Sequence, residues 1–333
     1  MPKPFVFSGT QIDAGSRVQV NIPVAKLYTG TDMSIPVTVI RGKRSGPTLF
    51  ISAAIHGDEL NGIEIIRRLQ SQESLKTLKG TLILVPMVNV FGVLNQSRYL
   101  PDRRDLNRCF PGSQKGSLAG RLANLFLKEI VEKCDYGIDL HTGAIHRSNL
   151  PQVRANLQDE ETLAMAEAFG VPVLLNSNLR DGSLRQAAAD SGVKILLYEA
   201  GEALRFDELC IRAGLRGVLD VMRHLGMLRK VNRKHKVAPF VASTSSWQRA
   251  TESGIVHLLK NLGDHVQKDE DIAKVYEPNG QRVETIKAKQ EGIVIGRLNI
   301  PLVQEGDALM HIAMFSQTEE VAEHVEIMHE IFE

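Results

Sequence analysis

The sequence predicts an α/β fold: a three-layer α/β/α domain with a mainly parallel central sheet, followed by a smaller all-β domain. Two observations predict it. Between about residues 47 and 225, short β-rich runs alternate with segments of helical periodicity, and most of the runs are apolar at consecutive positions. Such runs are typical of strands covered on both faces, as in a parallel sheet. After about residue 230 the chain changes to short alternating strands with glycine turns and no long internal helix.

The α/β part is expected to contain five strands and five helices in alternation. The strands are expected at residues 47–55, 81–89, 136–141, 171–176 and 194–201. The helices are expected at residues 62–72, 118–134, 159–169, 182–192 and 207–228. Binding sites in such folds collect beyond the carboxyl ends of the strands. Four polar residues follow or end a predicted strand, namely His56, Asn89, His141 and Glu199.

Three segments are expected along the chain. Residues 1–46 form an N-terminal β segment, 47–230 a catalytic domain, and 231–333 a β domain that ends in a helix. The basic run RKVNRKHKV, at the junction of the last two, is interpreted as a solvated connector.

A weak internal repeat organises the β domain. SGIVHLLKNLGDHVQKDEDI (253–272) resembles EGIVIGRLNIPLVQEGDALM (291–310), and each copy contains one strand, a Gly-Asp turn and an apolar finish. Two copies of one unit predict a small barrel-like domain of two interlocked halves. The tail TEEVAEHVEIMHEIFE has apolar residues at helical spacing, which predicts a packed terminal helix or an interface in a possible homo-oligomer.

Composition excludes several classes of partner. The net charge of +1 gives no electrostatic reason to expect nucleic acid or an acidic membrane surface. No apolar run is long enough to span a membrane, and the N-terminus lacks the apolar core of a signal peptide. The three cysteines are too few and too scattered for a disulfide framework. We therefore expect a cytoplasmic protein with no nucleic-acid or membrane partner.

The run AIHGDELN predicts half of a metal site. His56 and Glu59 are three residues apart at a predicted helix start, where such positions face the same way. Hydrolytic zinc sites use three protein ligands of His and carboxylate type and leave a place for water. The third ligand is expected to be His141, 82 residues beyond Glu59, with His146 as the alternative. Asp58 is the alternative to Glu59, which could also simply favour a helix N-terminus.

Two further carboxylates lie near these predicted ligands. Asp139 is two residues before His141, hence on the same face of its strand, and could fix that histidine by a hydrogen bond. Glu199, in the strand-ending run LLYEAGE, is the candidate general base, with Glu202 as the alternative. A capping role for Glu199 at the following helix is the structural alternative.

A rigid, arginine-rich stretch supplies candidate anion-binding groups. SRYLPDRRDLNRCFPG (97–112) contains four arginines between turn-forming residues. The planar guanidinium matches a carboxylate and remains charged when partly buried. Asn107 and Arg108 are expected to bind a substrate carboxylate, while Arg98 or Arg104 polarises the scissile carbonyl.

The ordered motifs HGDE, RDLNRCFPG, DLHTG and YEAGE resemble those of the succinylglutamate desuccinylase/aspartoacylase family of zinc hydrolases, which belongs with the metallocarboxypeptidases. The resemblance covers roughly residues 45–225. It implies a zinc-carboxypeptidase-like fold and one Zn2+ per chain held by His56, Glu59 and His141. It also implies that Glu199 is the catalytic glutamate.

The same resemblance assigns the substrate-binding groups. It implies that Asn107 and Arg108 are the carboxylate-binding pair and that Arg98 is the upstream arginine, with Arg104 as the alternative. The additional substrate arginine of aspartoacylase has no clear counterpart, since Arg147, Arg154 and Arg185 are all candidates.

The C-terminal segment is similar to the barrel-sandwich folds of biotinyl and lipoyl domains, which carry a modified lysine at the hairpin between their repeats. The corresponding hairpin, VYEPNGQRVE, has no lysine, so a swinging-arm carrier is not expected. We expect the domain to cover or narrow the mouth of the active site instead.

These observations favour a zinc-dependent deacylase that acts on a small N-acyl amino acid or related carboxylate. The alternatives are a metallocarboxypeptidase that trims peptides and a zinc-bearing binding protein without turnover. A wide cleft would favour the peptidase, whereas a mouth blocked by the β domain would favour deacylation.

Overall fold

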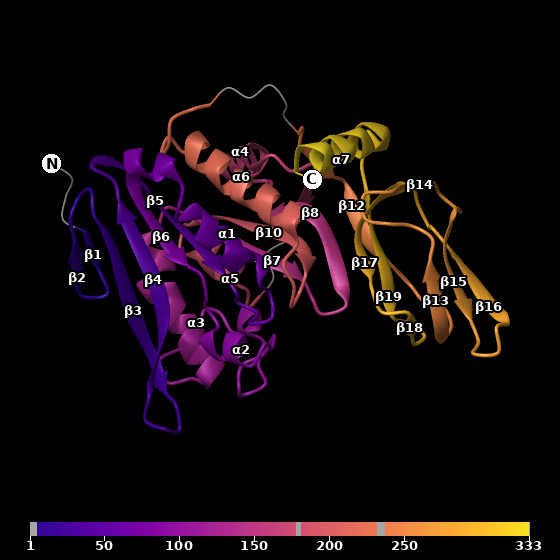
Figure 1. Ribbon diagram of the computed structural model, residues 1–333, viewed down its shortest axis with the longest axis horizontal. Coiled ribbons are helices and arrows are strands. Elements are labelled where there is room, and N and C mark those ends of the chain that lie inside the picture. The colour runs from indigo at the N-terminus through magenta and orange to yellow at the C-terminus, as the bar shows by residue number, and fades with distance from the viewer. Residues whose placement is uncertain (1–4, 178–180, 232–236, 333) are drawn as a thin grey trace.

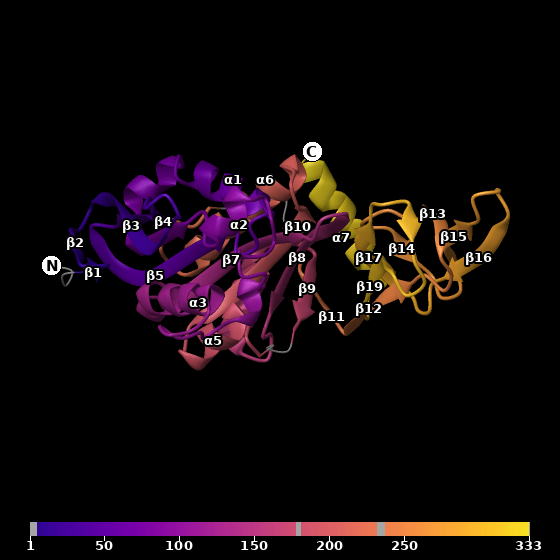
Figure 2. The same ribbon diagram turned by 90° about the horizontal axis from the view of Figure 1, so that it is seen from below.

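The computed structural model describes residues 5–177, 181–231 and 237–332 (Figures 1 and 2). Its helices are α1 (Asn61–Leu69), α2 (Val90–Leu94), α3 (Leu118–Glu129), α4 (Glu160–Phe169), α5 (Leu184–Asp190), α6 (Glu208–His224) and α7 (Thr318–Phe332). Short 3-10 helices are η1 (Glu73–Thr77), η2 (Leu106–Arg108) and η3 (Val131–Lys133).

The strands fall into an N-terminal and a C-terminal group. The first group comprises β1 (Phe5–Phe7), β2 (Thr10–Ile12), β3 (Arg17–Lys26), β4 (Asp32–Arg41), β5 (Arg44–Ala53), β6 (Lys79–Val85), β7 (Tyr136–Gly143), β8 (Arg147–Ala155), β9 (Val173–Asn176) and β10 (Lys194–Glu202). The second comprises β11 (Phe240–Ala242), β12 (Thr244–Arg249), β13 (Gly254–Leu258), β14 (His265–Val266), β15 (Asp271–Tyr276), β16 (Arg282–Lys287), β17 (Gly292–Leu298), β18 (Leu302–Val303) and β19 (Ala308–Met314).

The central sheet is mixed rather than mainly parallel, which corrects the expectation from sequence. β6, β5, β7 and β10 pair in parallel, as the apolar runs predicted, and the structure places them side by side in that order. Antiparallel strands extend this parallel centre on both sides, β4 and β3 beyond β6 and β8 beyond β10. β8 was not predicted, because its sequence RSNLPQVRA has a proline and two arginines and no continuous apolar run.

Helices pack on both faces of this sheet because successive strand residues point to opposite sides. On β5, Leu49 and Ile51 face a core that includes α1, α4 and α6. Phe50, between them, faces a second core that includes α3 and α5. Figure 2 shows the sheet with α1 and α6 on one side and α3 and α5 on the other. Because β5, β6, β7 and β10 are parallel, their carboxyl ends lie at the same edge of the sheet. The polar residues predicted at the strand ends lie at this edge.

The two copies of the sequence repeat exchange their short strands. β14, from the first copy, pairs with β17 of the second, and β18, from the second copy, pairs with β13 of the first. This exchange produces the interlocked β unit at the right of Figure 1. Its outer sheet has the order β16-β15-β13-β18.

The C-terminal β unit is continuous with the central sheet. β17 pairs antiparallel with β8, so that one 13-stranded sheet passes from the N-terminal part into the C-terminal part. β11 adds to this continuity by pairing with β9. The expected boundary near residue 231 is therefore a change in local architecture without a break in the sheet. Residues 232–236 of the predicted basic connector lie outside the described residues.

The C-terminal tail forms α7, which packs against both parts of the chain. Val321, Val325 and Met328 are buried in a cluster with Ile293 of β17 and Ala213 of α6. This shared core fixes the C-terminal unit against the α/β part. Within the described ranges, no helix has the length and apolarity that crossing a membrane requires.

Candidate active site

The turn between β5 and α1 is shaped by a close backbone approach. Ala54, directly after β5, has a positive φ of 53°, a conformation that L-residues rarely adopt. A Cβ atom on Gly57 would lie 1.9 Å from the carbonyl carbon of Gly92 in α2, so only glycine fits at position 57. The turn is thus pressed against α2, and this contact positions His56 and Glu59.

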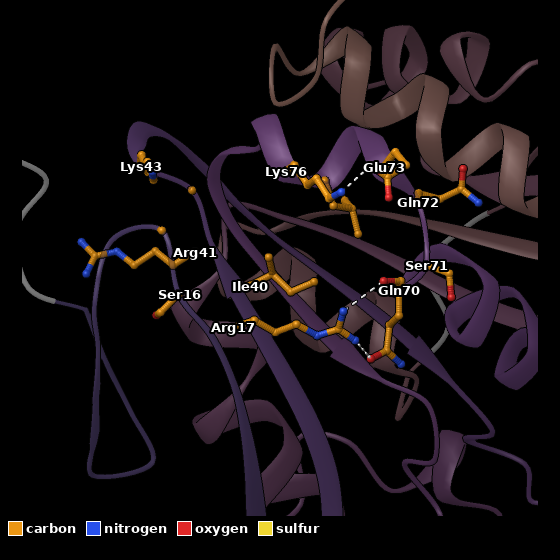
Figure 3. Close-up of a pocket in the computed structure, with 13 residues that line it drawn as sticks. Ser16, Arg17, Ile40, Arg41, Lys43, Gln70, Ser71, Gln72, Glu73 and Lys76 are labelled. Carbon is orange, nitrogen blue, oxygen red and sulfur yellow. Dashed lines mark hydrogen bonds and ion pairs between the residues drawn. The ribbon is translucent and has the colours of Figure 1, made fainter.

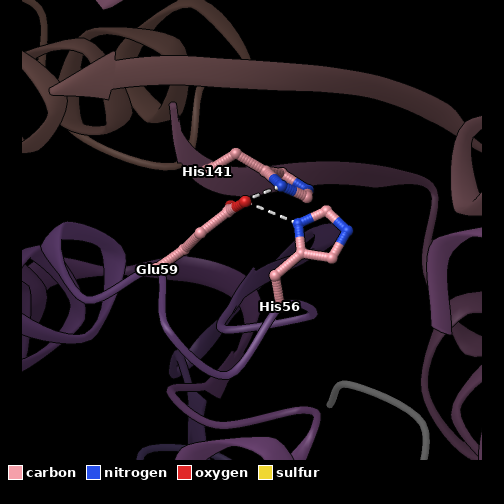
Figure 4. Close-up of side chains that lie close together, drawn as sticks. All are labelled: His56, Glu59 and His141. Carbon is pink, nitrogen blue, oxygen red and sulfur yellow. Dashed lines mark hydrogen bonds and ion pairs between the residues drawn. The ribbon is translucent and has the colours of Figure 1, made fainter. Parts of the chain in front are cut away.

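His56, Glu59 and His141 come together as a buried cluster (Figure 4). Nδ1 of His56 lies 2.6 Å from Oε1 of Glu59, and Nδ1 of His141 lies 2.8 Å from Oε2 of the same carboxylate. One ligand atom from each residue lies within 4.8 Å of the others. The structure therefore places together the three residues that the sequence predicted as metal ligands.

Each histidine of the cluster is also held by a second carboxylate. Nε2 of His141 lies 2.7 Å from Oδ2 of Asp139, whose Oδ1 accepts a hydrogen bond from Ser52 Oγ. Nε2 of His56 lies 3.2 Å from Oδ1 of Asp105. Both imidazoles thus direct Nδ1 toward Glu59 and Nε2 toward a carboxylate, an arrangement in which the carboxylate fixes the ring orientation. Two nitrogens and one carboxylate oxygen form a donor set that suits Zn2+.

The charges around the cluster favour an added positive charge. Burial lowers the pKa of His56, but Glu59 and Asp105 outweigh burial and raise it above its ordinary value. The pKa of His141 is raised well above its ordinary value because Asp139 and Glu59 outweigh burial in the same way. Burial alone would raise the pKa of Glu59, yet the two histidines lower it. The same carboxylates would stabilise a bound cation.

Asp105 is a residue of this site that sequence reasoning missed. Besides His56, its carboxylate pairs with Arg98 at 2.8 Å and accepts a hydrogen bond from the backbone N–H of Asn107. In the sequence, Asp105 begins the run DLNR, which also contains the predicted anion-binding pair. That position alone did not assign a function to Asp105.

Three alternatives considered from sequence lie outside the cluster. Asp58 is buried beside Glu59 without belonging to the metal-competent group, and His146 is exposed. Glu202 is buried, and its oxygens accept hydrogen bonds from the His146 backbone N–H and from Asn299 Nδ2. Glu202 therefore ties the turn after β7 to the C-terminal unit.

The arginine-rich loop brings three of its four predicted residues to the site. Nη1 of Arg98 lies 3.4 Å from Glu59 Oε1. Asn107 Oδ1 accepts a hydrogen bond from the Leu184 N–H at the start of α5, and Arg108 Nη1 donates to the Asn107 carbonyl. Arg104 is not brought to the site, because its side chain is largely exposed, 3.8 Å from Asp102.

Glu199 lies on β10 in register with His141 on the neighbouring strand. Its Oε2 is 2.6 Å from Nε of Arg154, an ion pair in which the N–H is not aligned for a hydrogen bond. Arg185, from α5, is buried nearby, and burial lowers the pKa of its guanidinium. The predicted base and two arginines considered from sequence thus lie beside the cluster.

One cavity of about 400 Å³ joins these groups. Its walls are formed by His56, Glu59, Arg98, Asn107, Arg108, His141, Thr142, Gly143, Ala144, Arg147, Asn149, Arg154, Ser183, Arg185, Leu197, Glu199 and Trp247. Trp247, on β12, is the lining residue that comes from the C-terminal β unit. Sequence reasoning predicted that this unit covers the mouth of the site but did not identify the residue.

A second cavity of about 410 Å³ lies between the β3–β4 edge and the end of α1 (Figure 3). Arg17 donates a hydrogen bond to the Gln70 carbonyl oxygen there, while the side chains of Arg41 and Lys43 extend away from that pair. Its lining residues include no histidine or cysteine. The candidate metal cluster and Glu199 line the first of these two cavities and not the second.

Comparisons with known proteins show the family of the chain. Residues 45–225 match the model of the succinylglutamate desuccinylase/aspartoacylase catalytic domain. The chain is 28% identical over 292 residues to the N-alpha-acetyl-L-2,4-diaminobutyric acid deacetylase of Halomonas elongata, covering 84% of this chain and 85% of that one.

Two further comparisons extend the similarity. The succinylglutamate desuccinylase of Pseudomonas aeruginosa is 29% identical over 210 residues, covering 58% of this chain and 62% of that protein. The crystal structure of a succinylglutamate desuccinylase/aspartoacylase from Rhodobacter sphaeroides superimposes with a TM-score of 0.80 at 25% identity, covering 91% of this chain and 98% of that one. The chain therefore belongs to the succinylglutamate desuccinylase/aspartoacylase family, whose catalytic domain it contains at residues 45–225.

Proposed function

We propose that the protein is a zinc-dependent deacylase that hydrolyses the amide bond of a small N-acyl amino acid. The observation that carries this proposal is the single cavity in which the His56–Glu59–His141 cluster, Glu199 and several arginines meet. Similarity to deacylases supports the reaction class: one relative is named a deacetylase of an N-acetylated diamino acid and another a succinylglutamate desuccinylase.

His56, Glu59 and His141 would hold one Zn2+, with Asp105 and Asp139 keeping the two imidazoles in the required orientation. When bound, the metal supplies a Lewis acid that polarises the acyl oxygen and lowers the pKa of water. The donor set of two nitrogens and one carboxylate oxygen is that of catalytic zinc sites with an open position.

Glu199 is proposed to accept the proton of the attacking water and to deliver it to the leaving nitrogen. Arg98 would stabilise the developing negative charge on the acyl oxygen, since Asp105 and Glu59 hold its guanidinium at the edge of the cluster. Asn107 and Arg108 would bind the substrate carboxylate, because both line the cavity from a loop anchored to α5.

The size of the cavity favours a small substrate over a peptide. About 400 Å³ is within the range of sites for small molecules, and Trp247 of the C-terminal unit closes one wall. A metallocarboxypeptidase would need a cleft long enough to bind several residues of a peptide substrate. A binding protein without turnover would have no need of Glu199 beside the metal cluster.

Replacing the proposed base tests this function. Glu199→Gln should retain about one zinc per chain and lose turnover by roughly 10²–10⁴-fold, because proton transfer is removed while the ligands remain. Metal analysis and rates on a panel of N-acetyl, N-succinyl and N-formyl amino acids, beside short peptides, are the measurements.

The control is Glu208→Gln, which removes an exposed carboxylate of α6 outside the cavity. We expect it to retain both zinc and turnover. Unchanged turnover in Glu199→Gln would remove Glu199 as the base, and a wild-type zinc content near zero would contradict the metal site. Cleavage of peptides in preference to N-acyl amino acids would establish the peptidase instead.

A further inference from the structure

The proposed base, Glu199, is paired with an arginine of the neighbouring antiparallel strand. Arg154 on β8 lies opposite Leu197, two residues before Glu199 on β10, so Arg154 and Glu199 are diagonal neighbours on one face of the sheet. Arg154 Nε lies 2.6 Å from Glu199 Oε2, and the two side chains are 25% and 20% exposed. Because both charges are mostly shielded from water, this pair constrains the carboxylate more than an exposed pair would.

Arg154 differs in this contact from the other arginines that line the cavity. Within the described ranges, Arg154 is the arginine that forms an ion pair with Glu199. Arg98 pairs instead with carboxylates at the metal cluster, and Arg147 lies over an aromatic ring. The position of the proposed base is therefore tied to one particular guanidinium.

A buried glutamine links Arg154 to the C-terminal β unit. Gln152 Oε1 accepts a long hydrogen bond of 3.5 Å from Arg154 Nη2. Gln152 is fully buried, and its Nε2 donates to the carbonyl oxygens of Leu150, at 3.2 Å, and of Ile295 on β17, at 3.1 Å. A buried amide whose donors are engaged in this way has a fixed orientation. Pairing with β17 thereby fixes Gln152, which in turn orients the guanidinium of Arg154.

The ion pair leaves one oxygen of Glu199 for proton transfer. It joins Arg154 Nε to Oε2, and because the Nε–H is not aligned for a hydrogen bond, the attraction is one of charge. A general base must hold its accepting oxygen within hydrogen-bond reach of the water that it deprotonates. A displacement of about 1 Å in such a group can cost roughly 100-fold in rate.

From this arrangement we infer that Arg154 is a positioning residue for the proposed base. It holds Oε2 of Glu199, so that Oε1 accepts the proton of the attacking water and then gives it to the leaving nitrogen. Arg154 keeps its own proton throughout and acts on the reaction through Glu199. The inference rests on the proposed deacylase function and extends it, since Gln152 links the position of the base to the C-terminal unit.

Arg154→Gln tests this role by separating kcat from KM. On the N-acyl amino acid that the wild type hydrolyses best, kcat should fall about tenfold or more while KM changes by less than about threefold, because the base is misplaced and the substrate contacts remain. Zinc content should stay at about one per chain. Arg154→Lys should restore a large part of kcat, since its ammonium can still pair with Glu199.

A second background separates positioning of the base from binding of the substrate. Zinc-loaded Glu199→Gln should bind the same N-acyl amino acid with little turnover, so that calorimetry gives its dissociation constant. Adding Arg154→Gln should change that constant by less than about twofold, because the carboxylate through which Arg154 acts is already absent. An increase of about tenfold or more would show that Arg154 binds the substrate directly, which would overturn the inference.

Gln152→Met tests the link to the C-terminal unit. Methionine has a similar length but no amide, so Arg154 loses its acceptor and the Ile295 carbonyl loses its donor. We expect kcat to fall by less than in Arg154→Gln, since the ion pair itself remains, and an unchanged kcat would remove Gln152 from the inference. Arg249→Gln, which replaces an exposed arginine of β12 outside the cavity, is the control and should leave kcat and KM unchanged.

Failure of the inference differs from failure of the proposed function. Turnover by the wild type with an unchanged kcat in Arg154→Gln would overturn the inference and leave the deacylase intact. Loss of zinc in both Arg154 variants would likewise overturn it, because the residue would then maintain the metal site and not the base. Absence of wild-type turnover on every compound of the panel would overturn the deacylase, and the positioning role with it.

Discussion

At the scale of single residues, the centre of the site is one carboxylate between two imidazoles. Each oxygen of Glu59 faces the Nδ1 atom of a different histidine. Asp105 and Asp139 hold the opposite nitrogens, so the orientation of both rings depends on residues outside the predicted ligand trio. Carboxylate partners of such histidines fix the tautomer and orientation of the ring and raise the basicity of the nitrogen that would bind the metal.

Replacing Asp139 tests this dependence. Asp139→Asn keeps the shape of the side chain but weakens the hydrogen bond that orients His141, and we expect zinc affinity to fall about 10–100-fold. Competition with a chelator of known affinity measures the change. Ser52→Ala, which removes the partner of the other Asp139 oxygen and leaves the carboxylate in place, should cause a smaller loss. Equal affinities for wild type and Asp139→Asn would show that Asp139 does not position the ligand.

At the scale of elements, the site depends on how closely the β5–α1 turn approaches α2. Gly57 lies against the backbone of Gly92, and Asn89 caps α2 by accepting a hydrogen bond from the Gly92 N–H. Backbone cannot yield as a flexible side chain can, so even one added methyl group must displace the turn. The position of His56 and Glu59 follows from this contact.

A methyl group added at Gly57 tests the packing of the turn. Gly57→Ala should lower the free energy of unfolding by about 1–3 kcal/mol and also weaken zinc binding, because the turn that carries two of the proposed metal ligands must move. Chemical denaturation and metal titration are the measurements. Gly120→Ala is the matched control, since a Cβ atom there has its nearest neighbour at 3.4 Å and lies within α3. The control should be neutral or slightly stabilising, and equal effects of the two changes would contradict the role of the close approach.

At the scale of the whole molecule, the α/β part and the C-terminal unit share one sheet and one buried cluster. β17 extends the central sheet through β8, and α7 packs residues such as Met328 against both parts. Glu202 accepts a hydrogen bond from Asn299 across the same boundary. The two parts are therefore expected to unfold together, although their local architectures differ.

Coincident unfolding can be measured with the single tryptophan of the chain, Trp247, which lies in the C-terminal unit. Its fluorescence and the far-ultraviolet circular dichroism of the helices should give the same transition midpoint. Met328→Ala should lower the free energy of unfolding by about 2–5 kcal/mol and shift both signals equally, because Met328 is fully buried in the shared cluster. The exposed Glu326→Ala on the same helix should have little effect. Two separate transitions would contradict a common folding unit.

The sequence by itself determined the elements of the parallel centre and the candidate metal cluster. Consecutive apolar residues mark strands buried on both faces, and polar residues at the ends of such strands meet at one edge of the sheet. His56, Glu59 and His141 could be predicted together for that reason. The repeat likewise predicted two interlocked halves, because a unit that cannot bury its own apolar face must pack against its copy.

Only the tertiary structure decided which other side chains reach this edge. β8 has no apolar run, so neither its antiparallel pairing nor the presence of Arg147 and Arg154 in the cavity could be read from periodicity. Asp105 and Arg104 lie in the same charged loop, yet one bonds His56 and the other faces solvent. Trp247 reaches the cavity through pairing of strands far apart in the sequence. Contacts of this kind depend on long-range packing, whereas local sequence pattern records only which face of its own element a residue occupies.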